Sequence, residues 1–118
     1  MSYQVIDNFL DQKDFQDIQG FLLGSECTWQ FSSITDQQER DDEFQFVHMF
    51  YRDWTPSETF SKTYPLLEKL KPFSIIGVKA NLLTKTDEIR EYSFHVDVER
   101  RGVTTAVFYV NSCNGYTL

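Results

Sequence analysis

Two residues near the end of the chain carry side chains that bind metal ions, and their spacing brings them together. His95 and Asp97 lie two positions apart in a segment, residues 91–98, whose pattern predicts a β-strand. Successive side chains of a strand point to opposite faces, so the imidazole and the carboxylate share a face and can reach one cation. They are two of the three ligands in the 2-His-1-carboxylate arrangement that binds non-haem Fe(II). The spacing therefore allows a metal site at His95 and Asp97; the alternative is an ordinary half-buried strand that carries this tripeptide by chance.

The residues that follow this pair extend the pattern. A turn-like segment, Glu99-Arg100-Arg101-Gly102, precedes a β-branched and aromatic run that predicts a strand over 103–111, ending in Tyr109-Val110-Asn111. Asn114-Gly115-Tyr116-Thr117 comes next. This order resembles the prolyl-hydroxylase-like 2-oxoglutarate/Fe(II)-dependent dioxygenases, in which an H-x-D strand is followed by a strand ending Y-[LV]-N and by a glycine-rich turn into a G-x-T strand.

The start of the chain is similar to the same family. Val5-Ile6-Asp7-Asn8-Phe9-Leu10, followed by an acidic amphipathic helix, is a common opening of its members. The resemblance implies that residues 1–118 form a single domain, the amino-terminal part of a 2-oxoglutarate oxygenase-like fold. The fold class that we expect is α+β, a partial double-stranded β-helix of the jelly-roll or cupin type with amino-terminal helices.

The resemblance also implies roles for individual residues. His95 and Asp97 match the two proximal ligands of Fe(II). Tyr109 matches a position where several members use a tyrosine hydroxyl to hydrogen-bond the co-substrate carboxylate, and Asn81 falls near another position that often touches the co-substrate. The implied cofactors are Fe(II) and 2-oxoglutarate, and the implied reaction is hydroxylation of a peptide or small-molecule substrate.

Two further groups of the family's site are expected beyond Leu118. They are the distal histidine and the arginine or lysine that pairs with the far carboxylate of 2-oxoglutarate. We therefore expect low or no activity from this chain, and no catalytic residue is assigned within it. A barrel that cannot close leaves a strand edge and an apolar face open, so we also expect self-association through strand edges, as a two-fold dimer.

Two alternatives from other classes stay open. The chain can be a catalytically silent β-sheet module for interaction or assembly, or a cupin-like binder of a sugar or other small molecule. His48, the only other histidine, lies on a predicted aromatic face with Phe44, Phe46 and Phe50, and we interpret it as structural. Trp29 and Trp54 are expected in the core or in a substrate cleft.

Composition limits the remaining possibilities. A net charge of −7 argues against binding the phosphates of a nucleic acid. The sequence has neither an apolar run of about 18 residues nor a basic-then-apolar leader, so a cytoplasmic protein without membrane spans is expected. Cys27 and Cys113 are far apart and are interpreted as free thiols.

The remaining secondary structure follows from hydrophobic periodicity and from capping residues. Asp11 is a predicted N-cap and Gly24 a predicted helix stop. Over 73–84 the apolar residues alternate with polar ones, and the polar face suits a barrel interior and a solvent face equally. The predicted elements are strands at 3–7, 29–34, 44–51 and 73–84, a helix at 12–23, a helical segment opened by Pro56, and a short helix at 65–70 with Pro65 first.

Overall fold

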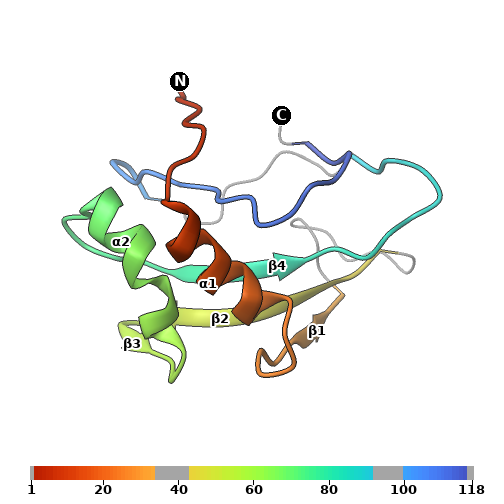
Figure 1. The fold of residues 1–118 in the computed structure, drawn as a ribbon, viewed down its shortest axis with the longest axis horizontal. Helices are drawn as coiled ribbons and strands as arrows, with labels where there is room; N and C mark the ends of the chain where they lie inside the picture. Colours follow the sequence, from red (N-terminus) through yellow and green to blue (C-terminus); the bar gives the residue numbers. More distant parts are fainter. Residues whose placement is uncertain (1, 34–42, 92–99, 117–118) are drawn as a thin grey trace. The chain divides into compact units, whose positions relative to one another are not determined.

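The computed structural model of the chain describes residues 2–33, 43–91 and 100–116. Within these ranges it has an α+β fold in which two α-helices and one 3₁₀-helix accompany a four-stranded sheet (Figure 1). The chain divides into two compact units, and it passes between them within two of the strands. The first unit comprises Met1–Thr28 and Met49–Lys79, and the second comprises Trp29–His48 and Ala80–Leu118.

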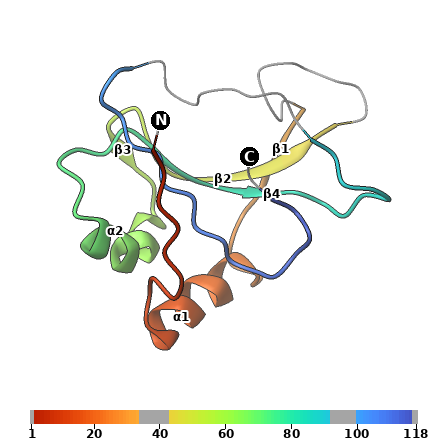
Figure 2. The same cartoon turned by 90° about the horizontal axis from the view of Figure 1, so that it is seen from above.

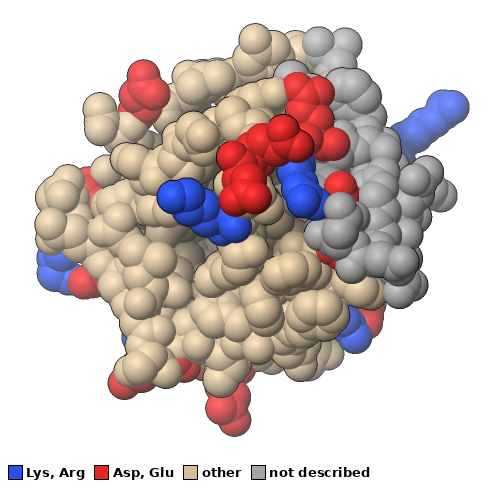
Figure 3. Space-filling model, turned by 90° about the vertical axis from the view of Figure 1, so that its right-hand side faces the viewer, with Lys and Arg blue, Asp and Glu red and all other residues tan. Residues whose placement is uncertain are grey.

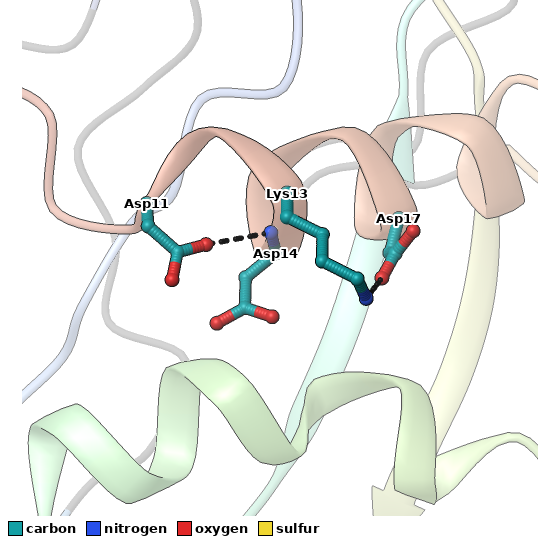
Figure 4. A network of polar contacts seen from close by, with 4 residues as sticks. All are labelled: Asp11, Lys13, Asp14 and Asp17. Carbon is teal, nitrogen blue, oxygen red and sulfur yellow. Dashed lines mark hydrogen bonds and ion pairs between the residues drawn. The ribbon is translucent and has the colours of Figure 1, made fainter.

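Helix α1, Gln12–Leu22, belongs to the first unit and confirms the predicted helix. The side chain of Asp11 accepts a hydrogen bond of 2.8 Å from the backbone N–H of Asp14, so it caps one of the amide groups that have no partner inside the helix (Figure 4). Figure 4 also shows the ion pair between Lys13 and Asp17, one helical turn apart at 3.0 Å. The buried face of the helix contains Ile18 and Leu22.

The end of α1 depends on a close approach of two backbone segments. The N–H of Gly24 donates to the carbonyl of Phe21, and a Cβ at position 24 would lie 2.6 Å from the carbonyl oxygen of Gly20. That distance is shorter than any side chain tolerates, because the obstacle is backbone and cannot rotate away. Gly24 is therefore the helix stop that the sequence predicts.

The sheet is organised around its longest strand. Its four strands are β1 (Gln30–Ser32), β2 (Gln45–Arg52), β3 (Thr55–Pro56) and β4 (Val78–Leu82). Strand β2 pairs with each of the other three. The β1 and β3 pairings are antiparallel, with Phe31 opposite Phe46 and Tyr51 opposite Pro56. The predicted strands at 29–34, 44–51 and 73–84 are confirmed, with shorter bounds for the first and last.

A tight turn joins β2 to β3 in the first unit. Its two central residues, Asp53 and Trp54, have φ angles of 51° and 64°, as in the two-residue hairpin loops that match the twist of a sheet. Glycine and asparagine are the usual residues there, because a side chain crowds the backbone at positive φ. Trp54 is 67% exposed at this turn, so a core position is wrong for this residue.

Pro56 does not open a helix, which corrects a second expectation. It pairs with Tyr51 in β3, and the next N–H, that of Ser57, donates to the carbonyl of Phe50 at 2.8 Å. These sheet contacts override the local preference of proline for a first helical turn. Helical structure begins only at the 3₁₀-helix η1, Phe60–Thr63.

Helix α2, Tyr64–Leu70, continues directly from η1 and carries Pro65 in its first turn, as predicted. It ends at Lys71, which has a left-handed backbone. η1 packs against both α1 and α2, and in Figure 2 the two helices lie on the same side of the strands of their unit. The ring of Phe60 connects η1 to its neighbours, with centroids 5.3 Å from Tyr51 and 5.6 Å from Tyr64.

Two predicted strands are not found. Residues 3–6 form no helix or strand, and the side chains of Tyr3 and Val5 are exposed. Alternating residue types specify a strand only where another strand supplies hydrogen bonds and one face is covered. Residues 103–110 also have no assigned helix or strand. The partner predicted for that strand, residues 91–98, lies almost wholly outside the described residues.

Candidate functional site

The two predicted metal ligands cannot be located. His95 and Asp97 both lie within 92–99, outside the described residues. Among the residues that the structure does describe, no three or more histidine, cysteine, aspartate or glutamate side chains gather where they could hold a metal ion. The metal site at His95 and Asp97 stays a prediction.

Asn81, a predicted contact of the co-substrate, lies on β4. Burial along this strand alternates as the sequence predicts, with Val78, Ala80 and Leu82 half-buried and the side chains of Lys79 and Asn81 exposed. The sequence left open whether this polar face lines an interior or meets solvent. Within the described residues it is exposed, so the Asn81 amide is accessible to a solute.

Tyr109, the other predicted contact of the co-substrate, is 56% exposed. Exposure alternates along this segment. Val107 is exposed like Tyr109, whereas Phe108 and Val110 are half-buried. This alternation has the period of an extended chain with one covered side. The phenol of Tyr109 therefore lies on the open side of the segment.

A side-chain hydrogen bond links both ends of the predicted site region. Tyr116, from the Asn114-Gly115-Tyr116-Thr117 motif, donates its hydroxyl to a carboxylate oxygen of Glu91, the first residue of the predicted metal-binding strand. This hydrogen bond raises the pKa of the Tyr116 phenol above its ordinary value, with a smaller contribution from desolvation. Segments 25 residues apart in sequence are thereby neighbours in the second unit.

Gly102 supplies the turn predicted between the two site strands. Its φ is 78°, in the left-handed region, and residues 101–102 form a turn. Glycine adopts that conformation without the steric cost that other residues meet. The chain therefore turns where the sequence analysis expected.

His48 is only 7% exposed and lies in β2. Its ring meets the ring of Trp29 edge to face, with centroids 6.1 Å apart. Its predicted place among aromatic side chains is confirmed. A buried imidazole in contact with an indole fits a structural role better than metal binding, which needs ligands that converge on one point.

Sequence analysis missed a group of three aromatic rings in the second unit, which we call the phenylalanine cluster: Phe31, Phe44 and Phe46. The ring centroids of Phe31 lie 5.7 Å from Phe44 and 5.9 Å from Phe46, and those of Phe44 and Phe46 lie 6.0 Å apart. Phe31 is 65% exposed and Phe44 39%. The alternation of Phe44 and Phe46 was the available signal, but it predicts a shared face and not whether that face is covered.

Both cysteines are free thiols, as predicted, but their surroundings differ. Cys27 is buried, and burial raises the pKa of its thiol because the thiolate loses its hydration. Cys113 is exposed. Modifying reagents in solution therefore have access to one thiol and not to the other.

One face of the molecule shows how the charged side chains of the described part are distributed. On the face drawn in Figure 3, the lysine and arginine side chains of the described part are scattered or lie beside aspartate and glutamate, with no separate basic patch. Across the described ranges, no helix combines the length and apolar character that crossing a membrane requires.

Comparison of the chain with protein-family models, with curated proteins and with solved structures found no match.

Proposed function

We propose that this chain is the amino-terminal part of a 2-oxoglutarate- and Fe(II)-dependent dioxygenase domain with a double-stranded β-helix fold. The order of its motifs supports this assignment, from the His95-x-Asp97 pair to Tyr109-Val110-Asn111 and the glycine-containing segment after it. The observation that carries it furthest is the hydrogen bond between Tyr116 and Glu91. It joins the last of these motifs to Glu91, the first residue of the predicted strand that carries His95 and Asp97.

Four residues have roles in this proposal. His95 and Asp97 hold Fe(II), while the Tyr109 hydroxyl and the Asn81 amide orient the co-substrate by hydrogen bonds. The exposed positions of Tyr109 and Asn81 leave both groups accessible to a solute. When bound, Fe(II), 2-oxoglutarate and O₂ together supply the oxidation of a substrate C–H bond, and the protein supplies orientation.

The proposal predicts weak metal binding, because two protein ligands hold a cation less securely than three. Titration calorimetry with Mn(II) measures it, since this ion accepts the same nitrogen and oxygen ligands. His95→Ala and Asp97→Ala should each abolish the binding heat. The control Asp87→Ala removes an exposed carboxylate that lies outside the motif and should leave binding unchanged.

Equal Mn(II) binding by the wild type and the His95→Ala variant would overturn the site assignment. Addition of 2-oxoglutarate should strengthen Mn(II) binding in the wild type, and Tyr109→Phe should reduce that gain. Little or no succinate should form, because no arginine or lysine within residues 1–118 is assigned as the partner of the far carboxylate of 2-oxoglutarate. Robust turnover that is lost in Lys79→Ala would instead identify Lys79 as a substitute.

Self-association through strand edges is also part of the proposal. The exposed side chains of Val107 and Tyr109 support it, because an exposed apolar surface favours association. Sedimentation at micromolar concentration should show a dimer. A monomer at every accessible concentration would remove this part and leave the metal site untouched.

A further inference from the structure

We propose that Asn114 and Gly115 form a site of spontaneous modification, at which Asn114 loses its side-chain amide and becomes aspartate or isoaspartate. This inference does not depend on the proposed metal site. The chain contains four asparagines, and only Asn114 is followed by glycine. Glycine is important there because the reaction closes a ring on the backbone nitrogen of the next residue, and a side chain on that residue would obstruct the approach.

The reaction needs only hydroxide and water. Hydroxide removes the backbone N–H proton of Gly115, and the nitrogen attacks Cγ of the Asn114 side chain. A C–N bond forms at Cγ while the bond from Cγ to the side-chain nitrogen breaks, and that nitrogen takes a proton from water and leaves as ammonia. Water then adds to either carbonyl of the cyclic imide and breaks one of its C–N bonds. Opening at the main-chain carbonyl gives isoaspartate, and opening at the other gives aspartate.

The fold leaves both reacting groups open. Asn114 and Gly115 are exposed, and neither belongs to a helix or strand. Neither forms a hydrogen bond to another described residue. No hydrogen bond of the described structure therefore has to break before the backbone nitrogen turns toward the side chain.

The other asparagines are less favourably placed. Asn81 lies in β4, which pairs with β2, and the following residue has a branched side chain. Asn8 has a left-handed backbone with φ 53° and precedes the half-buried Phe9. Asn111 is exposed like Asn114, but it precedes a serine. We therefore expect Asn114 to react fastest and Asn111 next.

The structure also indicates a variant that blocks the ring closure without disturbing the fold. Gly102 is the only glycine of the described residues with a positive φ, so the backbone at Gly115 suits any residue. A Cβ at Gly115 would meet only Sγ of Cys113, at an ordinary contact distance of 3.6 Å. Gly115→Ala therefore adds the obstructing methyl group at little structural cost.

The products differ from the original chain beside a contact of the second unit. Asn114 lies two residues before Tyr116, whose hydroxyl donates to Glu91. Either product adds a negative charge near this hydrogen bond, and isoaspartate also lengthens the main chain. The added charge allows anion exchange to separate the modified protein from the unmodified one.

Incubation of the native full chain in water enriched in a heavy oxygen isotope, followed by peptide mapping with mass spectrometry, tests the proposal. Asn114 should be replaced by aspartate and isoaspartate that carry the heavy oxygen, with ammonia released in equal amount. The rate should rise about tenfold for each unit of pH, because hydroxide generates the attacking nitrogen. Gly115→Ala should slow the reaction about tenfold, equivalent to a barrier higher by about 1.4 kcal/mol.

Ser112→Gly is the complementary variant, because it gives Asn111 the same following residue as Asn114. Asn111 should then react at a rate similar to that of Asn114. Equal rates at the two asparagines of the wild type, or an unchanged rate in Gly115→Ala, would overturn the proposal. Loss of the Asn114 amide only after unfolding in urea would overturn it too, since the fold would then protect the site. Circular dichroism establishes that each variant is folded.

Discussion

Two groups of phenylalanine side chains involve β2, one near each end of the strand, and they differ in exposure. Phe50 is 5% exposed and meets the ring of Phe21 from α1, with centroids 6.2 Å apart. The phenylalanine cluster near the other end includes Phe31, which is 65% exposed. Phe46 and Phe50 lie four positions apart in β2, so their side chains point to the same face of the strand. The two positions therefore share residue type and strand face.

The difference shows that an alternating aromatic pattern specifies which side chains share a strand face, but not whether another element covers that face. Helix α1 covers Phe50 in the first unit, and the burial of a phenylalanine contributes about 1.5–3 kcal/mol to stability. The rings of the phenylalanine cluster contact one another, and each such pair contributes about 0.5–1.5 kcal/mol. The covered end contributes more to the stability of the fold, whereas Phe31 and Phe44 at the other end remain exposed to solvent.

The largest expected effect follows directly from this contrast. Phe50→Ala should lower the free energy of unfolding by about 3–5 kcal/mol, because it removes a buried ring and leaves a cavity. Phe31→Ala should lower it by less, about 1–2 kcal/mol, because it removes two ring contacts at the surface. Urea denaturation of both variants measures the two changes. Similar losses of unfolding free energy in the two variants would show that the exposed rings stabilise the fold as much as the buried ring does, which would contradict this comparison.

The next effect tests whether the end of α1, the helix that covers Phe50, requires glycine at position 24. Gly24→Ala should destabilise the protein by more than about 1 kcal/mol, because the added Cβ meets the carbonyl oxygen of Gly20. Gly20→Ala is the matched control, since nothing lies within 4 Å of its Cβ position and alanine favours a helix interior. It should raise stability by up to about 1 kcal/mol. Thermal unfolding should show the two variants shifting in opposite directions.

A smaller effect is expected at the start of the same helix. Asp11→Ala should cost about 1 kcal/mol, because the N–H of Asp14 loses its capping acceptor. Lys13→Ala should cause no measurable change, since its ion pair with Asp17 is exposed to solvent. Comparison of the two variants by urea denaturation separates capping from surface charge. A larger loss for Lys13→Ala would contradict this assignment.

The smallest effect concerns the thiols, one in each unit. Cys113 should react quickly with a thiol reagent in the native protein, whereas Cys27 should react only after unfolding. Because burial raises the pKa of Cys27, the folded state disfavours its thiolate. That contribution to stability is fully present below the ordinary thiol pKa and is lost as the pH rises through the raised value. A Cys27→Ala variant should therefore lose less stability at alkaline pH than the wild type.

Local sequence was sufficient for several elements. The cap at Asp11, the stop at Gly24 and the start of α2 near Pro65 were predicted because each depends on hydrogen bonds or sterics within a few residues. The alternation in β4 was predicted for a similar reason, since a strand with one covered face requires it. Fold class followed as far as a mixed helix and sheet, and the finer assignment to a double-stranded β-helix is a proposal.

Tertiary structure decided what local patterns could not. Residues 3–6 have the pattern of a strand but pair with no strand in the described part of the chain, and Pro56 joins a strand because Tyr51 lies opposite it. At the candidate site, the sequence named Asn81 and Tyr109 by resemblance, but their exposure depends on what covers their segments. The phenylalanine cluster arises only where β1 pairs with β2, because ring contacts between residues far apart in sequence require the register of the sheet.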